Sequence, residues 1–192
     1  MSIRVHKLSF RYSSTWILKD LSFEIPEGVT AIIAGANGSG KTTLLKILAT
    51  LLEPTRGEIK TFDRSQVAWL GHELGIYFDL TAQENLEFHY RLQGFKPNFK
   101  KIGEVLEQVG LSSLKQQRAG NLSMGQKKRL GLAKRLLDDK PCLILDEPFA
   151  NLDVEGKKIL NRLFEEWGAK KKTILFTSHD YENNSNHLRI SL

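Results

Sequence analysis

The sequence predicts an α/β fold in which an antiparallel β part precedes a parallel sheet with crossover helices and a helical insertion. Short apolar runs alternate with amphipathic segments of helical length along much of the chain. The first residues instead alternate apolar and polar side chains, and residues 81–120 have helical periodicity without a clear strand. The 192 residues, 41% hydrophobic and 26% charged, fit one globular domain over 1–192.

The N-terminal part predicts two half-buried antiparallel strands, because residues 3–10 and 21–25 alternate in polarity. A turn at 26–28 ends the second. Residues 29–34 are apolar nearly throughout, which is typical of a strand buried on both faces of a sheet. The apolar positions that follow predict a helix reaching Leu52, which Glu53 and Pro54 should stop.

Residues 81–138 predict a helical subdomain inserted in this core. Thr81 and Glu84 form the sequence of a capping box opening a helix toward Gly94. A second helix follows from the spacing of Ile102, Val105, Leu106 and Val109. The later pattern predicts parallel strands with right-handed crossovers, in the order helix 123–137, strand 142–145, helix 154–167, strand 173–177 and a short last strand 189–192.

Composition narrows the functional classes. Lys and Arg number 28 against 22 Asp and Glu, a net charge of +6 that sits in short scattered clusters, so we expect no direct nucleic-acid partner. The longest charge-free run, residues 28–40, is too short to span a bilayer. The single cysteine and the lack of an apolar leader favour a reducing cytoplasm.

A glycine-rich loop follows the buried strand and opens a helix, which is the context of a phosphate-binding loop. In such a loop backbone amides bind oxyanions, Lys41 reaches the β and γ phosphates, and the Thr42 hydroxyl ligates Mg²⁺. The alternative is a glycine-rich turn without a ligand. The predicted nucleotide-binding residues here are Gly35, Ala36, Asn37, Gly38, Ser39, Gly40, Lys41, Thr42 and Thr43.

Two carboxylates, Asp146 and Glu147, follow the apolar strand 142–145. In a doubly wound sheet that strand end lies beside the phosphate loop, and buried carboxylates there need a cation or a proton. We expect Asp146 on the Mg²⁺ side and Glu147 polarising the attacking water, which together define a P-loop nucleoside triphosphatase. A strand-end turn without catalytic function is the alternative.

The segment Asn121-Leu-Ser-Met-Gly-Gln126 heads a predicted helix. By itself Ser123 to Gln126 is a capping box, but Gly125 in the first helical turn suggests a close backbone approach. The segment resembles the Leu-Ser-Gly-Gly-Gln signature of ATP-binding cassette (ABC) ATPases, with Met124 at the first glycine. The resemblance covers about residues 3–181 and implies a RecA-like core. It also implies that Ser123, Gly125 and Gln126 contact ATP held by a second subunit.

The same resemblance assigns further positions. Tyr12 is similar to the aromatic residue that stacks on adenine, and the segment Asn151-Leu-Asp153 resembles the D-loop. His179 resembles the switch histidine, giving Lys41, Glu147 and His179 as catalytic residues. His72 stands where the family has a metal-ligating glutamine, with Glu73 as the alternative ligand.

Within the family, Trp69-Leu-Gly-His72 and Leu80-Thr-Ala-Gln-Glu-Asn-Leu86 look like the haem-exporter ATPases of cytochrome c maturation. This implies an ATPase using ATP and Mg²⁺, forming a homodimer or a dimer with a related ATPase subunit. It would power a transmembrane permease subunit from the cytoplasmic face of the membrane. The alternative is a non-transport ABC ATPase acting on nucleic acid, the ribosome or a cytosolic assembly machine. A GTPase is disfavoured, since no Asn-Lys-x-Asp motif occurs.

Overall fold

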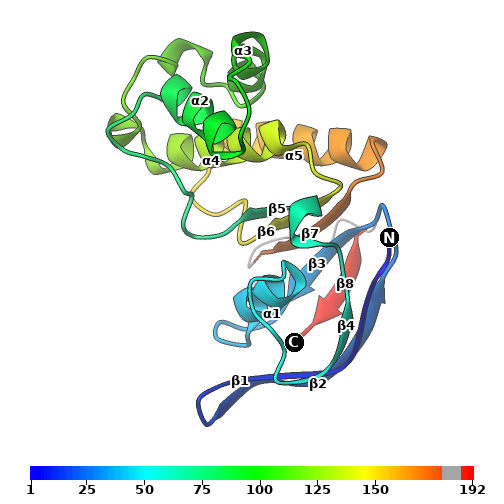
Figure 1. Cartoon of the computed structure of the whole chain (residues 1–192). Coiled ribbons are helices and arrows are strands. Elements are labelled where there is room, and N and C mark those ends of the chain that lie inside the picture. The colour runs from blue at the N-terminus through cyan, green and yellow to red at the C-terminus, as the bar shows by residue number, and fades with distance from the viewer. Residues whose placement is uncertain (179–186) are drawn as a thin grey trace. The chain divides into compact units, whose positions relative to one another are not determined.

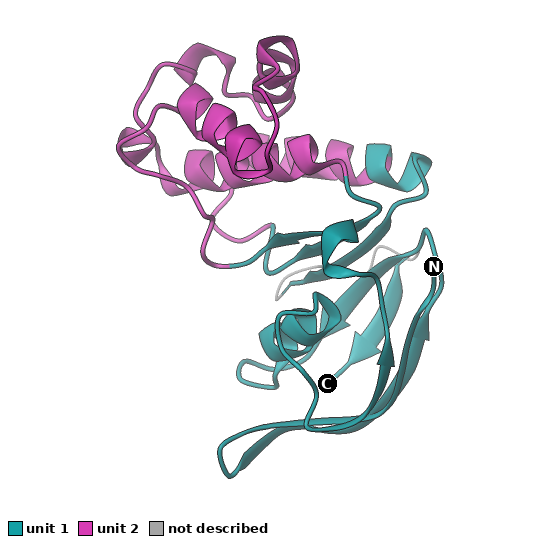
Figure 2. Cartoon of the chain, in the orientation of Figure 1, with its two compact units in different colours: residues 1–71, 140–148, 166–192 teal, residues 72–139, 149–165 magenta. Residues whose placement is uncertain are grey.

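The computed structural model describes residues 1–178 and 187–192, which form two compact units (Figure 2). Unit 1 comprises residues 1–71, 140–148 and 166–192, and unit 2 comprises residues 72–139 and 149–165. The segment 81–138, predicted as a helical subdomain, lies within unit 2. The assignment of 1–192 to one domain stays a prediction.

Unit 1 contains a parallel sheet of five strands in the order β5-β6-β7-β3-β8. Its central strands are almost entirely buried, which explains their uninterrupted apolar sequences. The predicted α/β class with a parallel core is therefore confirmed. The strands are β3 (Thr30–Ala34), β5 (Val67–Leu70), β6 (Cys142–Leu145), β7 (Thr173–Thr177) and β8 (Leu188–Ser191).

A second sheet of unit 1 is antiparallel, with β1 (Ile3–Tyr12) between β2 (Thr15–Ile25) and β4 (Arg56–Lys60). The first two strands were predicted, but both are longer than predicted. Register shifts in the ladder break the alternation of polarity on which the prediction was based, and the two strands meet in a tight hairpin. Strand β4 was not predicted, since its side chains are mostly exposed. Gly57 is required in it: a Cβ there would lie 2.3 Å from the Lys7 carbonyl oxygen.

Helix α1 (Lys41–Leu48) ends earlier than the predicted limit at Leu52, which corrects that expectation. Thr50 has a φ of 56°, and its N–H donates to the Ile47 carbonyl at 3.0 Å. The Leu51 N–H donates to the Lys46 carbonyl at 2.8 Å, which completes a left-handed Schellman cap. The helix lies between the two sheets (Figure 1), where its leucines join the core of unit 1.

Unit 2 is built around α2 (Ala82–Leu92), α3 (Phe99–Gln108) and α4 (Met124–Asp138), with most of α5 (Val154–Ala169). The predicted capping box is present, because the Thr81 hydroxyl accepts from the Glu84 N–H at 3.1 Å and the Glu84 carboxylate accepts from the Thr81 N–H at 2.7 Å. Helices α2, α3 and α4 share an apolar core that includes Leu86, Ile102 and Leu130. Among the described residues, no helix combines the length and the apolarity that crossing a membrane requires.

A largely buried ionic cluster joins α2 to the end of α4. The Asp138 carboxylate lies 2.6 Å from His89 Nε2 and 3.0 Å from Arg135 Nη1, and Gln93 donates to it as well. Burial pushes the pKa of Asp138 upward, but the hydrogen bond from His89 and the charge of Arg135 outweigh it. The net effect holds the pKa of Asp138 below its ordinary value of 3.8.

Candidate functional site

The glycine-rich loop connects β3 to α1 in unit 1, as the sequence predicts. Gly38 and Gly40 have φ of 80° and 98°, in the left-handed region that favours glycine. A Cβ at Gly40 would lie 2.7 Å from a methyl of Leu18 and 2.8 Å from one of Ile17, so the loop is also sterically limited to glycine there. The chain thus turns tightly into the N-terminal end of α1, where the partial positive charge favours anions.

Lys41 folds back over this loop. Its Nζ donates to the carbonyl oxygens of Gly35 and Ala36, both at 2.9 Å, and the residue is 7% exposed. Both acceptors are uncharged, so they orient the ammonium group without neutralising it. A nearly buried cation held this way is a strong attractor for a polyanion that reaches the loop.

Thr42 and Asp146 meet in the structure. The Thr42 hydroxyl donates to Asp146 Oδ2 at 2.8 Å, and the Asp146 carboxylate is almost completely buried at the end of β6. The Asp146 N–H donates to the Leu70 carbonyl at 2.7 Å, which fixes the backbone of this position against β5. The two side chains predicted on the Mg²⁺ side therefore lie within hydrogen-bond distance of each other.

Thr177 was not among the predicted site residues, yet it links both acids. Its hydroxyl donates to Asp146 Oδ1 at 2.7 Å and accepts from the Glu147 N–H at 2.8 Å. Glu147 has a φ of 48°, a conformation that costs a non-glycine residue energy and persists only where the surrounding structure holds it. The sequence shows a polar residue at the end of the apolar run of β7, but only the structure shows that Thr177 is fully buried beside Asp146.

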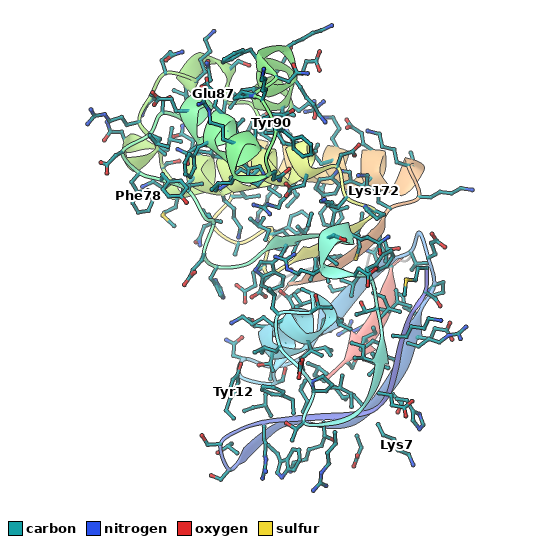
Figure 3. All side chains as sticks on the ribbon, in the orientation of Figure 1. Lys7, Tyr12, Phe78, Glu87, Tyr90 and Lys172 are labelled. Carbon is teal, nitrogen blue, oxygen red and sulfur yellow. The ribbon has the colours of Figure 1, made fainter. Side chains whose placement is uncertain are left out.

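Tyr12 ends β1 at the hairpin of unit 1, where Figure 3 labels it. One edge contact orders the ring, since its centroid lies 4.8 Å from that of Phe10 with the planes at 84°. The residue is 48% exposed, which leaves ring surface for stacking. Its predicted adenine contact stays a prediction. His179, the predicted switch histidine, lies outside the described residues.

The predicted signature segment lies in unit 2. Ser123 caps α4, accepting from the Gln126 N–H at 3.2 Å and donating its own N–H to Gln126 Oε1 at 2.9 Å. A Cβ on Gly125 would lie 3.1 Å from the Asn151 carbonyl oxygen. The close backbone approach inferred at Gly125 is therefore made to the segment that resembles the D-loop. Lys128 strengthens this contact, because its Nζ donates to the Ala150 carbonyl at 2.9 Å.

Three other predicted residues, Asp153, His72 and the alternative ligand Glu73, also belong to unit 2. Asp153 caps the start of α5, where its carboxylate accepts from the Gly156 N–H at 2.7 Å. His72 and Glu73 are exposed residues in the segment after β5. Their predicted contacts with nucleotide and metal stay predictions. In the described part of the chain, no group of three or more His, Cys, Asp or Glu side chains is arranged to hold a metal.

A glycine loop between strand and helix, a lysine bent over it and an acid at the end of another strand of the same parallel sheet define a P-loop nucleoside triphosphatase. A sequence model of the family described as ABC transporter matches residues 18–150. The chain belongs to the ABC transporter family, as an ATP-binding subunit with ATPase chemistry. The predicted fold class and enzyme class are thereby confirmed.

Individual relatives agree over nearly the whole chain. A cytochrome c biogenesis ATP-binding export protein of Haemophilus influenzae is 37% identical, covering 96% of this chain and 93% of its own. The protein of the same name from Xylella fastidiosa is 41% identical, covering 84% and 76%. A candidate ABC transporter ATP-binding protein of Pyrococcus furiosus matches with a TM-score of 0.85 at 28% identity, covering 100% and 98%. A dimeric ATP-binding cassette bound to ADP and Pi matches with a TM-score of 0.82 at 25% identity, covering 93% and 88%.

Proposed function

We propose that the chain binds Mg²⁺-ATP at the loop 35–43 and hydrolyses it with Glu147 as the group that polarises water. The observation that carries this proposal is the hydrogen-bonded series Thr42, Asp146, Thr177 and Glu147, which begins one residue after Lys41. It connects the phosphate-binding loop to the catalytic acid through two buried groups. The last bond of the series is made by the backbone N–H of Glu147, so the series fixes the position of that residue relative to the loop.

The donor set at Thr42 and Asp146 fits magnesium. The ion prefers oxygen ligands and takes only one or two from protein when phosphates and water supply the others. A hydroxyl and a carboxylate within 2.8 Å of each other provide that pair. When bound, Mg²⁺ neutralises phosphate charge that develops during transfer. His72 is the further metal-side residue of the proposal, with Glu73 as the alternative.

Glu147 supplies the base. Its N–H is anchored on the Thr177 hydroxyl and its backbone is left-handed, so the side chain leaves the end of β6 in a fixed direction. A carboxylate held there can accept a hydrogen bond from water attacking the γ phosphate. Lys41 keeps the leaving and transferred phosphates in place, and His179 is the proposed contact to the γ phosphate.

Ser123, Gly125 and Gln126 act on a second copy of the chain in this proposal. They form the N-terminal end of α4, a ready site for phosphate oxygens. The solved relative with ADP and Pi is described as a dimer, which supports ATP-dependent pairing of two copies. Asp153, which caps α5 beside the signature segment, would lie at the same dimer contact.

In this proposal, ATP-driven closure of the dimer powers a separate transmembrane subunit at the cytoplasmic face of a membrane. The relatives from H. influenzae and X. fastidiosa are cytochrome c biogenesis export proteins by name, and they match across most of the chain. We therefore place this protein in cytochrome c biogenesis, with haem as the exported compound to be tested.

The test is genetic. Disrupting the gene in its native host should abolish cytochrome c assembly, as measured by haem-stained gels and reduced-minus-oxidised spectra. A wild-type copy should restore it, whereas a Glu147→Gln copy expressed at equal level should not. Normal cytochrome c in the disrupted strain would refute the assignment to this pathway. Full restoration by the Glu147→Gln copy would refute the role of hydrolysis.

A further inference from the structure

Residues 91–101 run from the end of α2 to the start of α3 in unit 2 and carry exposed apolar side chains. They are here called the 91–101 segment. Leu92, Phe95 and Phe99 are each 62% exposed. Leu92 lies three residues after the buried His89, and Phe99 lies three residues before the buried Ile102. They extend the buried faces of their helices beyond the core into solvent. Several large apolar side chains exposed within one short segment are unusual on a protein surface and point to an interaction site.

The segment is held in place by hydrogen bonds at both ends. Gly94 has a φ of 81° and donates its N–H to the Arg91 carbonyl, while the Phe95 N–H donates to the Tyr90 carbonyl, both at 3.0 Å. This Schellman cap ends α2. The Asn98 side chain then caps α3 by accepting from the Lys101 N–H at 3.0 Å. The phenyl rings are therefore presented outward by fixed backbone.

The charge of the segment is entirely positive. No Asp or Glu occurs between Glu87 and Glu104, and the segment itself carries +4. Its basic residues interleave with the apolar ones, unlike those of the cluster Lys170–Lys172. The basic residues are Arg91, Lys96, Lys100 and Lys101.

We propose that the 91–101 segment binds the surface of an anionic lipid bilayer, with its apolar side chains in the headgroup boundary and its lysines on lipid phosphates. Apolar and basic side chains side by side are the pattern of interfacial membrane binding. Phenylalanine can stack on unpaired bases, but the equally exposed Leu92 has no ring to stack, whereas the headgroup boundary of a bilayer covers leucine and phenylalanine alike, so the observations favour lipid. This lipid contact goes beyond the proposed function, because the chain would bind the bilayer directly, without the transmembrane subunit.

The test uses the purified full chain and vesicles of phosphatidylcholine with or without phosphatidylglycerol, separated by flotation. The wild type should float with anionic vesicles only, and salt should weaken the binding. Phe95→Ser with Phe99→Ser should weaken it at least about tenfold, and so should Lys96→Gln with Lys100→Gln. The matched controls are Lys60→Gln with Lys170→Gln, which removes equal charge elsewhere, and Phe95→Leu with Phe99→Leu. Both should retain binding.

Absence of binding to anionic vesicles overturns the proposal, as does equal binding to neutral ones. An equal loss of binding in the Lys60/Lys170 control would also overturn it, because binding would then depend on the net charge of the protein and not on the 91–101 segment. Capture of duplex DNA or RNA by the same residues, without vesicle binding, would assign the segment to nucleic acid instead. The ATPase rate of each variant in solution should equal that of the wild type. Failure here therefore leaves the proposed function untouched, and failure of hydrolysis leaves the lipid surface untouched.

Discussion

Replacing Thr177 by valine should disrupt the site without changing its shape. Valine has nearly the volume of threonine but no hydroxyl, so the variant loses the bond to Asp146 at 2.7 Å and the bond from the Glu147 N–H at 2.8 Å. The residue is fully buried, and water cannot replace the hydroxyl without opening the core. One bond involves a carboxylate and the other leaves a backbone N–H without this acceptor, which together cost about 3 kcal/mol.

The free energy of unfolding of Thr177→Val should therefore fall by about 3 kcal/mol, which corresponds to roughly 6–12 °C in Tm for a chain of this size. The ATPase rate should fall too, because the left-handed Glu147 loses its anchor. Urea unfolding followed by tryptophan fluorescence and a phosphate-release assay measure the two effects. Thr177→Ser keeps the hydroxyl and should preserve most of both. A valine variant with wild-type stability and turnover would refute this account of Glu147.

Two further predictions concern charged groups. Purified Glu147→Gln should bind ATP as the wild type does but hydrolyse it orders of magnitude more slowly. It should therefore accumulate as an ATP-bound dimer, which size-exclusion chromatography would detect. Unchanged turnover would show that Glu147 has no catalytic role. The depressed pKa of Asp138 predicts a stabilising contribution that is fully present above pH 3.8 and is lost as pH falls through the folded-state pKa. In urea unfolding, Asp138→Asn should be less stable than the wild type near neutral pH, and the difference in the free energy of unfolding should shrink on acidification. A difference that does not depend on pH would contradict the stabilising role of the ionic cluster.

Much of the fold follows from local pattern. The strands β3, β6 and β7 are buried on both faces, so their apolar sequences identify them without tertiary information. The same holds for the capped helix α2, because Thr81 and Glu84 encode its start. Strand β4 was missed because it lies at a sheet edge with exposed side chains, and pairing with β1 alone makes it a strand.

The misjudged end of α1 has a different cause. Leu51 and Leu52 continue the apolar spacing, which predicts a longer helix. Thr50 nevertheless adopts a left-handed conformation that threonine rarely takes, so the sequence lacks the glycine or asparagine that usually indicates such a cap. Thr177 was overlooked because its importance comes from the pairing of β7 with β6, which brings it beside Asp146. Lys41, Thr42 and Asp146 were predictable, since a loop and a strand end dictate their positions.

Charge counting also missed the 91–101 segment. Scattered lysines suggest solvated faces, and the interleaved apolar residues of this cluster could equally belong to a core until the exposure of Phe95 and Phe99 is known. Exposure depends on how the core of unit 2 is filled, which periodicity cannot tell. Phe99 has the spacing of a core residue on α3 and still points to solvent.

The most direct measurement is a structure of the protein with a non-hydrolysable ATP analogue and Mg²⁺. The account predicts the β and γ phosphates against the loop 35–43, with Lys41 released from the Gly35 and Ala36 carbonyls to contact them and the metal beside Thr42 and Asp146. A nucleotide bound elsewhere, with Lys41 still bonded to both carbonyls, would contradict it.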